Sequence, residues 1–258
     1  MRHKTTQFRI AQCEPKKPLL MIFNPPVITV DEARSIDSAA MSALGISSLV
    51  LMENAARGIC ELIKQKFSDV PSILIACGFG NNGGDGLALA RLLAAENIEA
   101  STYLIDAGRT LSADAAANHR LLASCKLPLC CDSNGITFRK DIQRLDSKCL
   151  IVDCLLGTGI QGNPKAPYSE VIQAVNQSAA QVLAVDVPSG LNAQTGVAGS
   201  PTVVANHTMT FVGKKLGFET RQGQQHTGDV SVAPIGLPVC WVKSFLKQHR
   251  EKANSDEC

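Results

Sequence analysis

The stretch from residue 72 to residue 95 constrains the fold of this chain more than any other. Residues 72–77 have the length and the β-branched content of a buried strand. Residues 78–86 contain five glycines among nine positions, and residues 87–95 have the composition of a helix. Glycine lets a backbone adopt positive φ angles and approach a ligand closely, and amides that open a helix favour an anion. This stretch therefore predicts a strand, a ligand-binding loop and a helix.

Taken literally, Gly78, Gly80 and Gly83 have the spacing of a dinucleotide-binding turn. Asp106 closes a strand-like run about 20 residues later, where such folds bind a ribose. Asp85 argues against a standard dehydrogenase, because a pyrophosphate needs donors rather than a carboxylate. The carboxylate and its neighbouring carboxamides suit either a cation bound nearby or a polar ring held in place of a phosphate. The loop alone leaves both interpretations open.

The rest of the chain alternates between strand and helix patterns. Thr29 and Glu32 form a capping box that starts a helix ending at Gly45, and a second helix is expected to end at Lys66. The other expected strands are residues 101–105, 149–152, 182–185, 208–212 and 230–233, with a short strand and turn within 127–136. The other expected helices are residues 112–124, 139–147 and 169–178. This order predicts an α/β fold with a parallel sheet and helices on both faces.

The chain is expected to have three parts. Residues 1–27 are basic, and we expect a disordered extension there rather than a transit peptide. Residues 28–240 suit one α/β domain. Residues 241–258 form a charged tail, which we expect to be a loose helix.

The composition excludes several classes of function. A net charge of +2 gives no strong attraction to nucleic acid or to a membrane surface, and no apolar run approaches the ~18 residues of a membrane span. The ten cysteines form no C-x-x-C pair, which favours a reducing compartment over a disulfide scaffold or a zinc site. No nucleophile elbow, H-E-x-x-H motif or P-loop occurs. We therefore expect a cytoplasmic protein with a small-molecule ligand.

Three strands are expected to end in loops that combine acid or amide groups with glycines, at residues 78–86, 153–163 and 186–190. In open α/β sheets, ligands bind beyond the carboxyl ends of the strands. A single Asp at a strand end is as often a helix cap, but three such loops at one edge indicate a site. Their oxygen-rich side chains suit a hard cation and a carboxylate that acts as general acid or base. The expected chemistry is proton transfer on a polar ligand.

The motifs that carry a family resemblance are residues 80–86 (GNNGGDG), 152–153 followed by 157–159, 185–190 (VDVPSG), 52–56 (MENAA) and 207–211 (HTMTF). Together they resemble the NAD(P)H-hydrate epimerase family, the YjeF N-terminal domain, over roughly residues 28–238. The resemblance implies a Rossmann-like three-layer sandwich with a mostly parallel central sheet. It also implies an isomerase of nicotinamide cofactor repair, which interconverts the R and S forms of NADHX and NADPHX. In these damaged cofactors the nicotinamide ring is hydrated at C6.

The resemblance implies partners as well. A separate dehydratase that uses ATP or ADP completes the repair, and because this sequence stops at Cys258 we expect that activity on another chain. Family members are commonly homodimers, so a homodimer is expected here.

The resemblance further assigns the site. It implies one potassium ion per subunit, with Asn82, Asp153 and Ser189 as its ligands. The implied substrate contacts are Asn81, Asn82, Gly83, Gly84, Asp85, Gly157, Thr158, Gly159, Ile160, Gln161, Gly162, Asn163 and Asp186.

We hypothesise a mechanism in which N1 expels the C6 hydroxyl once a carboxyl group protonates it, after which the planar iminium takes water back on either face. Asp153 is the first candidate for the proton carrier, because potassium beside it would fix its position, and Asp186 is the second.

Two alternatives to an epimerase stay open. One is an NAD-dependent dehydrogenase, which Asp85 disfavours. The other is a non-catalytic nucleotide- or protein-binding module of the same fold, since relatives act in messenger RNA decapping and apolipoprotein binding.

Overall fold

Seven parallel strands form the central sheet in the computed structural model of this chain, which describes residues 25–256. The order across the sheet is β4-β3-β2-β5-β6-β7-β9, and β1 and β8 form a separate parallel pair. The strands are β1 (Val27–Ile28), β2 (Ile73–Cys77), β3 (Ser101–Leu104), β4 (Cys130–Cys131), β5 (Leu150–Cys154), β6 (Gln181–Val185), β7 (His207–Phe211), β8 (Lys214–Lys215) and β9 (Asp229–Ala233). The helices are α1 (Val30–Leu44), α2 (Ser48–Lys66), α3 (Asn81–Ala95), α4 (Ala113–Ser124), α5 (Ile136–Ile142), α6 (Tyr168–Gln177), the 3₁₀ helix η2 (Leu216–Glu219), α7 (Arg221–Thr227) and α8 (Val239–Asp256).

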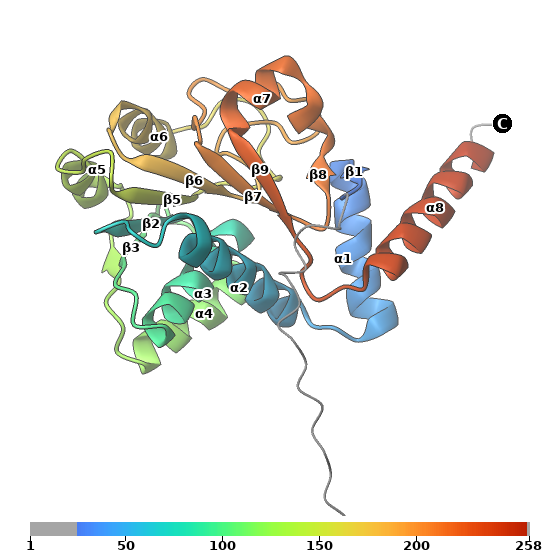
Figure 1. Cartoon of the computed structure of the whole chain (residues 1–258), viewed down its shortest axis with the longest axis horizontal. Helices are drawn as coiled ribbons and strands as arrows, with labels where there is room; N and C mark the ends of the chain where they lie inside the picture. Colours follow the sequence, from blue (N-terminus) through green and yellow to red (C-terminus); the bar gives the residue numbers. More distant parts are fainter. Residues whose placement is uncertain (1–24, 257–258) are drawn as a thin grey trace, which may run out of the picture.

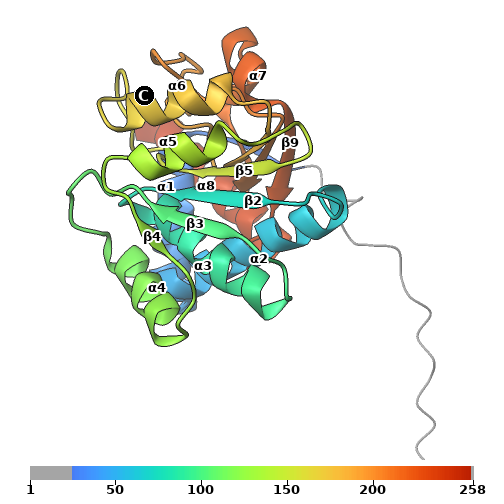
Figure 2. The ribbon, with the colours of Figure 1, turned by 90° about the vertical axis from the view of Figure 1, so that its left-hand side faces the viewer.

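Helices cover both faces of the sheet, as the sequence predicts. On the central strand, Ile73, Ile75 and Cys77 pack with α2, α3 and α4, whereas Leu74 and Ala76 pack with α5 and α6. Figures 1 and 2 show these two groups of helices on opposite sides of the sheet. Every residue of β2 is buried because alternate side chains enter two different cores. The three-layer α/β architecture is confirmed.

The sheet changes its winding direction between β2 and β5. From β2 the chain goes through α3 to β3 and then to β4, toward one edge. From β5 it goes through α6 to β6 and on to β7 and β9, toward the other edge. The loops that leave β2 and β5 therefore separate to opposite faces and open a crevice between them. Such a switch point is where open α/β sheets bind their ligands.

The two ends of the described chain lie beside each other. The expected capping box is present at α1, where Thr29 accepts from the Glu32 amide and Glu32 accepts from the Thr29 amide. Residues beyond 240 form α8, whose Val242 and Leu246 are buried in the same core as α1, and Arg250 pairs with Glu32 at 2.6 Å. The expected N-terminal extension lies mostly outside the described residues. Within residues 25–256, no helix is long and apolar enough to span a membrane.

The expected loop at residues 78–86 is mostly helical, which corrects the prediction. Helix α3 begins at Asn81 rather than at residue 87, and none of the five glycines has a positive φ. The glycines serve close packing instead. A Cβ at Gly83 would lie 1.8 Å from the Gly78 carbonyl oxygen, and one at Gly86 would lie 2.7 Å from the Cys77 sulfur. Glycine weakens a helix by about 1 kcal/mol relative to alanine, so packing has overridden propensity here.

The bounds of α5 also differ clearly from the prediction, and α7 was not expected. Helix α5 occupies Ile136–Ile142 rather than residues 139–147. The Asp132 carboxylate accepts from the amides of Ile136 (3.0 Å) and Phe138 (2.8 Å), which sets the start of the helix.

Candidate functional site

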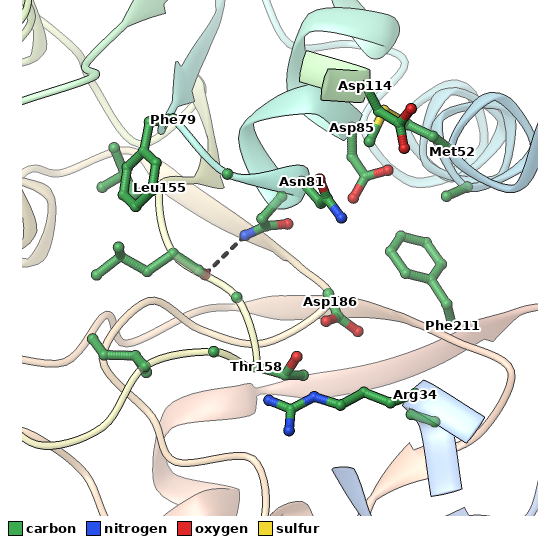
Figure 3. A pocket seen from close by; sticks show the side chains of 18 of the residues that line it. Arg34, Met52, Phe79, Asn81, Asp85, Asp114, Leu155, Thr158, Asp186 and Phe211 are labelled. Atoms are coloured by element: carbon green, nitrogen blue, oxygen red, sulfur yellow. Dashed lines mark hydrogen bonds between the residues drawn. The ribbon is translucent and has the colours of Figure 1, made fainter. Parts of the chain in front are cut away.

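A cavity of about 980 Å³ lies at the carboxyl ends of the strands, where the winding of the sheet reverses. Its floor comes from the loops after β2, β5 and β6, and its other walls come from α1, α2 and the segment after β7. Figure 3 shows its side chains converging on one space from these separate segments. A volume of this size lies at the upper end of the range for small-molecule sites. The three loops that the sequence placed at one edge do meet around a single cavity.

Beneath the cavity, Asp153 is completely buried and accepts three hydrogen bonds. Its Oδ1 accepts from the Ser189 hydroxyl at 2.6 Å and from the Leu155 amide at 3.2 Å. Its Oδ2 accepts from the Ser189 amide at 2.9 Å. Burial raises the pKa of Asp153 to about 6, while the hydrogen bonds from Ser189 and Leu155 act in the opposite direction. The carboxylate therefore ties the loop after β5 to the loop after β6.

Asn82 joins this set through the backbone of Leu156. The Asn82 amide group donates to the Leu156 carbonyl at 2.8 Å, and the Leu156 amide donates to the Ser189 hydroxyl at 2.9 Å. The other side-chain atom of Asn82, Oδ1, is buried and has no hydrogen-bond partner. A buried acceptor without a partner costs about 1–3 kcal/mol. A buried oxygen without a donor suits a hard cation, which takes side-chain amide oxygens as ligands.

Asp186 enters the cavity from the end of β6 in an unusual backbone conformation. Its φ of 62° lies in the left-handed region, which non-glycine residues rarely adopt and which occurs mainly at functional sites. Its Oδ1 accepts from Lys215 at 2.9 Å and from the Thr210 hydroxyl at 3.3 Å. Lys215 also donates to Thr210 Oγ1 at 2.8 Å and to the Phe211 carbonyl at 3.2 Å, and its side chain is 3% exposed. Asp186 is thus held as an ion pair on one side and faces the cavity on the other.

Asp85 lines the cavity from the second turn of α3. It is 9% exposed, and its carboxyl group forms no hydrogen bond or ion pair with any residue between 25 and 256. Burial, followed by the charges of Asp186, Asp37 and Asp114, raises the pKa of Asp85 well above its usual range. Figure 3 shows the carboxyl groups of Asp85 and Asp186 entering the same space from different elements. Asp37 and Asp114 line the cavity as well, so Asp85 and Asp186 are two of four carboxyl groups there and differ in that Asp186 is held by Lys215.

The residues expected to contact substrate fall into two groups. Those that line the cavity are Asn81, Asn82, Asp85, Gly157, Thr158, Gly159, Ile160, Gln161, Asn163 and Asp186. Gly83, Gly84 and Gly162 do not line it. A Cβ at Gly84 would lie 2.7 Å from the Met52 side chain, so this glycine lets α2 and α3 approach each other. Asp153 and Ser189 are buried behind the cavity wall.

Sequence reasoning missed several residues of the cavity. Asp37 comes from α1, Lys215 from β8, and Arg109 follows β3 with its guanidinium 4.0 Å from the centre of the Phe79 ring. Tyr168 lies against the same ring, with the two centres 6.4 Å apart. Arg109 could have been identified from the sequence, because it directly follows Gly108 in the turn after an expected strand. No sequence pattern places α1 over this edge, so Asp37 had no signal.

Asp106, which the fingerprint suggested as a ribose contact, does not line the cavity. Its carboxylate accepts from the Gly108 amide at 2.9 Å and so stabilises its own turn.

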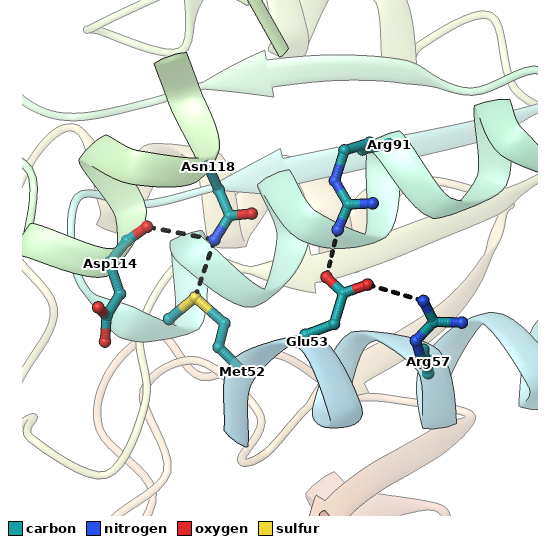
Figure 4. Close-up of polar contacts among 6 residues, drawn as sticks. All are labelled: Met52, Glu53, Arg57, Arg91, Asp114 and Asn118. Carbon is teal, nitrogen blue, oxygen red and sulfur yellow. Dashed lines mark hydrogen bonds and ion pairs between the residues drawn. The ribbon is translucent and has the colours of Figure 1, made fainter. Parts of the chain in front are cut away.

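The polar residues on α2 hold helices together rather than face the cavity. Glu53 pairs with Arg91 of α3 and with Arg57 of its own helix, as Figure 4 shows. Asn54, which the sequence allowed as a site residue, donates to the Ile235 carbonyl at 3.1 Å. Their neighbour Met52 does line the cavity, and its sulfur accepts from Asn118 at 3.2 Å.

Residues 48–217 match the family described as YjeF-related protein N-terminus. The chain is 36% identical to an NAD(P)H-hydrate epimerase of Rhodopirellula baltica, over 89% of this chain and 91% of that protein. It is 33% identical to an epimerase of the same name from Levilactobacillus brevis, over 81% and 94%. A bifunctional NAD(P)H-hydrate repair enzyme of Coxiella burnetii is 34% identical over 85% of this chain and 43% of its own length.

Among solved structures, the yeast protein ynu0 superposes with a TM-score of 0.70 at 18% identity, covering 85% of this chain and 93% of the yeast chain. At that identity the match supports the fold alone.

Proposed function

This chain belongs to the family of YjeF-related N-terminal domains, and we propose on that basis that it is an NAD(P)H-hydrate epimerase. The enzyme would be an isomerase that interconverts the R and S forms of NADHX and NADPHX. The observation that carries the proposal is the cavity at the switch point of the sheet, where the first turn of α3 with Asn82, the end of β5 with Asp153 and the loop after β6 with Ser189 meet. It lies where this fold class binds nucleotides.

The charges around the cavity support one orientation of the ligand. Asp85, Asp186 and Asp37 would repel phosphate groups but accept a neutral, hydrated nicotinamide ring. Arg109 and Phe79 lie at the side where α3 begins, and the opening of a helix favours phosphate. The nicotinamide end of the substrate would therefore lie between the carboxyl groups. The phosphate and adenosine end would lie toward Arg109.

We propose that a potassium ion binds beside this cavity, with Asn82, Asp153 and Ser189 as its ligands. The buried Asn82 Oδ1 without a partner supports such an ion, and one buried carboxylate balances one monovalent charge. Within residues 25–256 no three His, Cys, Asp or Glu side chains come together as a metal-binding group, as a transition metal or zinc would require. When bound, the ion would supply a fixed positive charge that keeps the loops after β5 and β6 in place.

The residues of this chain would perform an acid–base reaction. The Asp186 carboxylate faces the cavity while Lys215 holds its other oxygen, so it can accept or donate a proton at a fixed position. Asp153 was the first candidate for this role from the sequence. Because both of its oxygens are used by Ser189 and Leu155 and it does not line the cavity, we favour Asp186.

Two further proposals concern the setting of the reaction. We propose that a dehydratase uses the product, because two relatives of this chain are named as bifunctional NAD(P)H-hydrate repair enzymes. We also propose a cytoplasmic homodimer, whose subunit number light scattering would measure.

The test is incubation of the purified protein with S-NADHX, followed by chromatography of the R epimer with and without potassium chloride. We expect appearance of R well above the spontaneous rate, and a faster rate with potassium than with choline chloride at equal ionic strength. Asp186→Asn is the control for catalysis. Binding of NADPHX without epimerisation would indicate the non-catalytic module instead, and reduction of NAD with alcohols would indicate a dehydrogenase.

A further inference from the structure

We infer that Asp85 is a second catalytic acid/base group, which acts on the face of the substrate ring opposite to the face that Asp186 serves. The inference rests on the proposed epimerase function and deepens it. The sequence resemblance gave Asp85 only a contact with substrate.

The position of Asp85 is fixed by its helix. Three glycines hold the first turns of α3 against neighbouring segments: Gly83 against Gly78, Gly84 against Met52, and Gly86 against Cys77 and Cys154. A Cβ at any of them would lie within 3.0 Å of those neighbours. The helix therefore cannot slide or rotate, and the side chain of its second turn is directed into the cavity.

The carboxyl group of Asp85 has no structural task. It is nine-tenths buried, and it neither caps a helix nor pairs with a cation in the described part of the chain. A buried carboxyl group without a partner is destabilising, and such groups concentrate at functional sites. A carboxyl group placed in the cavity wall without a partner there points to a role with the ligand.

The two carboxyl groups are held in different states. Asp186 is ion-paired with Lys215. Within the described part of the chain, no Lys, Arg or His pairs with Asp85. The groups that interact with its charge are the carboxylates of Asp186 after β6, Asp37 on α1 and Asp114 at the start of α4, and the thiols of Cys77 on β2 and Cys154 on β5. Burial and the three carboxylates raise the pKa of Asp85, which favours its protonated form. A carboxyl group without a cation partner and a second one held by Lys215 are suited to act as acid and base in one reaction.

Epimerisation at C6 explains why two groups are needed. In one direction, the protonated Asp85 donates its proton to the C6 hydroxyl, the C6–O bond breaks to release water, and the N1 lone pair forms the C6=N1 bond. A water molecule then attacks C6 from the opposite face and gives a proton to the Asp186 carboxylate, while the electron pair returns to N1. The proton has moved from Asp85 to Asp186, and exchange with solvent resets both. The reverse epimerisation uses the same steps with the roles exchanged.

A single group could serve both faces only if the ring turned over in the cavity. The phosphate end of the substrate would restrain the ring, so one group on each face is the simpler arrangement. Figure 3 shows Asp85 on α3 and Asp186 at the end of β6 at different sides of the same space.

Oxygen exchange tests the inference. The protein is incubated in water labelled with oxygen-18 with each pure epimer of NADHX, and both epimerisation and incorporation of label are followed by mass spectrometry after subtraction of the spontaneous rate. For Asp85→Asn we expect epimerisation to fall about 100-fold or more. This variant should still exchange label into one epimer with retention, through Asp186. Asp186→Asn should show the complementary pattern, with exchange into the other epimer only.

The outcomes separate the two levels of the proposal. A wild-type protein that does not epimerise NADHX contradicts the proposed function itself. If the wild-type protein epimerises NADHX, two results would contradict the assignment of Asp85 alone. One is an Asp85→Asn variant that is as active as the wild type. The other is that both variants lose exchange into both epimers alike. Asp69→Asn, an exposed position before β2, is the matched control. If Asp85→Asn does not fold, Asp85→Ser is measured in the same way.

Discussion

Asp153 and Asp85 are both buried carboxyl groups near the same edge of the sheet, yet their surroundings are opposite. Asp153 accepts three hydrogen bonds that link the loops after β5 and β6. Asp85 accepts none from the residues that the structure describes, and it lines the cavity. Burial raises the pKa of both, but hydrogen bonds limit the rise for Asp153 to about 6, whereas carboxylates add to it for Asp85. The carboxylate of Asp153 holds two segments of the fold together, whereas the carboxyl group of Asp85 is free to donate a proton to a ligand in the cavity.

The contrast shows that burial alone does not identify a catalytic acid. What distinguishes the two positions is the number of donors that the fold supplies to each. The same substitution, Asp to Asn, should therefore have opposite effects on stability at the two sites, and this difference can be measured.

The largest effect is expected for Asp153→Asn. An asparagine side chain has one oxygen acceptor, so its NH₂ group would face either the Ser189 amide or the Leu155 amide, and two donors would meet in a buried place. We expect a loss of about 3 kcal/mol in the free energy of unfolding, measured by urea denaturation. Asp69→Asn provides the baseline for an exposed Asp. An unchanged midpoint would mean that Asp153 does not join the two loops.

A somewhat smaller effect is expected for Lys215→Met, which removes the partner of Asp186. The Asp186 side chain is 19% exposed, so solvent would offset part of the cost of leaving its charge unpaired, and we expect a loss of about 2 kcal/mol. Epimerase activity should also fall because the carboxylate is no longer held. The double variant with Asp186→Asn should recover much of the stability. Additive losses in the double variant would argue that the pair is not coupled.

The sequence predicted most of the fold but only part of the site. The capping box at Thr29 and Glu32 and the apolar runs gave most helices and strands correctly, because these signals are local. The loops with Asp153 and Asp186 were found because parallel strands must end at one edge. The structure confirms that these loops approach one another. The potassium ion and the substrate that they are expected to bind stay predictions.

The remaining site residues depend on packing between distant segments. Lys215 and Asp37 reach the cavity only because β8 pairs with β1 and thereby places α1 over the edge of the sheet. The glycines of α3 were interpreted as a flexible loop because their packing partners, Met52 and Cys154, belong to other elements. A single sequence does not show such contacts.

A gain rather than a loss is expected for Asp85→Asn. The folded protein holds the proton of Asp85 more tightly than the unfolded chain does, so this group favours folding at low pH and its contribution is lost as the pH rises toward the folded pKa. The variant should therefore match the wild type near pH 4 and be more stable by about 1 kcal/mol or more near pH 8. Thermal unfolding across this range measures the difference. A variant that is less stable at every pH would show that Asp85 has a structural partner after all.

The smallest effect is expected at the far end of the cavity, for Arg109→Ala. The guanidinium lies over the Phe79 ring and is exposed, and such a contact is worth about 0.5–1 kcal/mol. If Arg109 faces the phosphate and adenosine end of the substrate, KM should rise about 2- to 5-fold while kcat stays constant, since the ring and its carboxyl groups are untouched. Arg57→Ala, on the outer side of α2, is the matched control. A fall in kcat with unchanged KM would place the reacting ring beside Arg109 and would reverse the orientation of the substrate relative to Asp85 and Asp186.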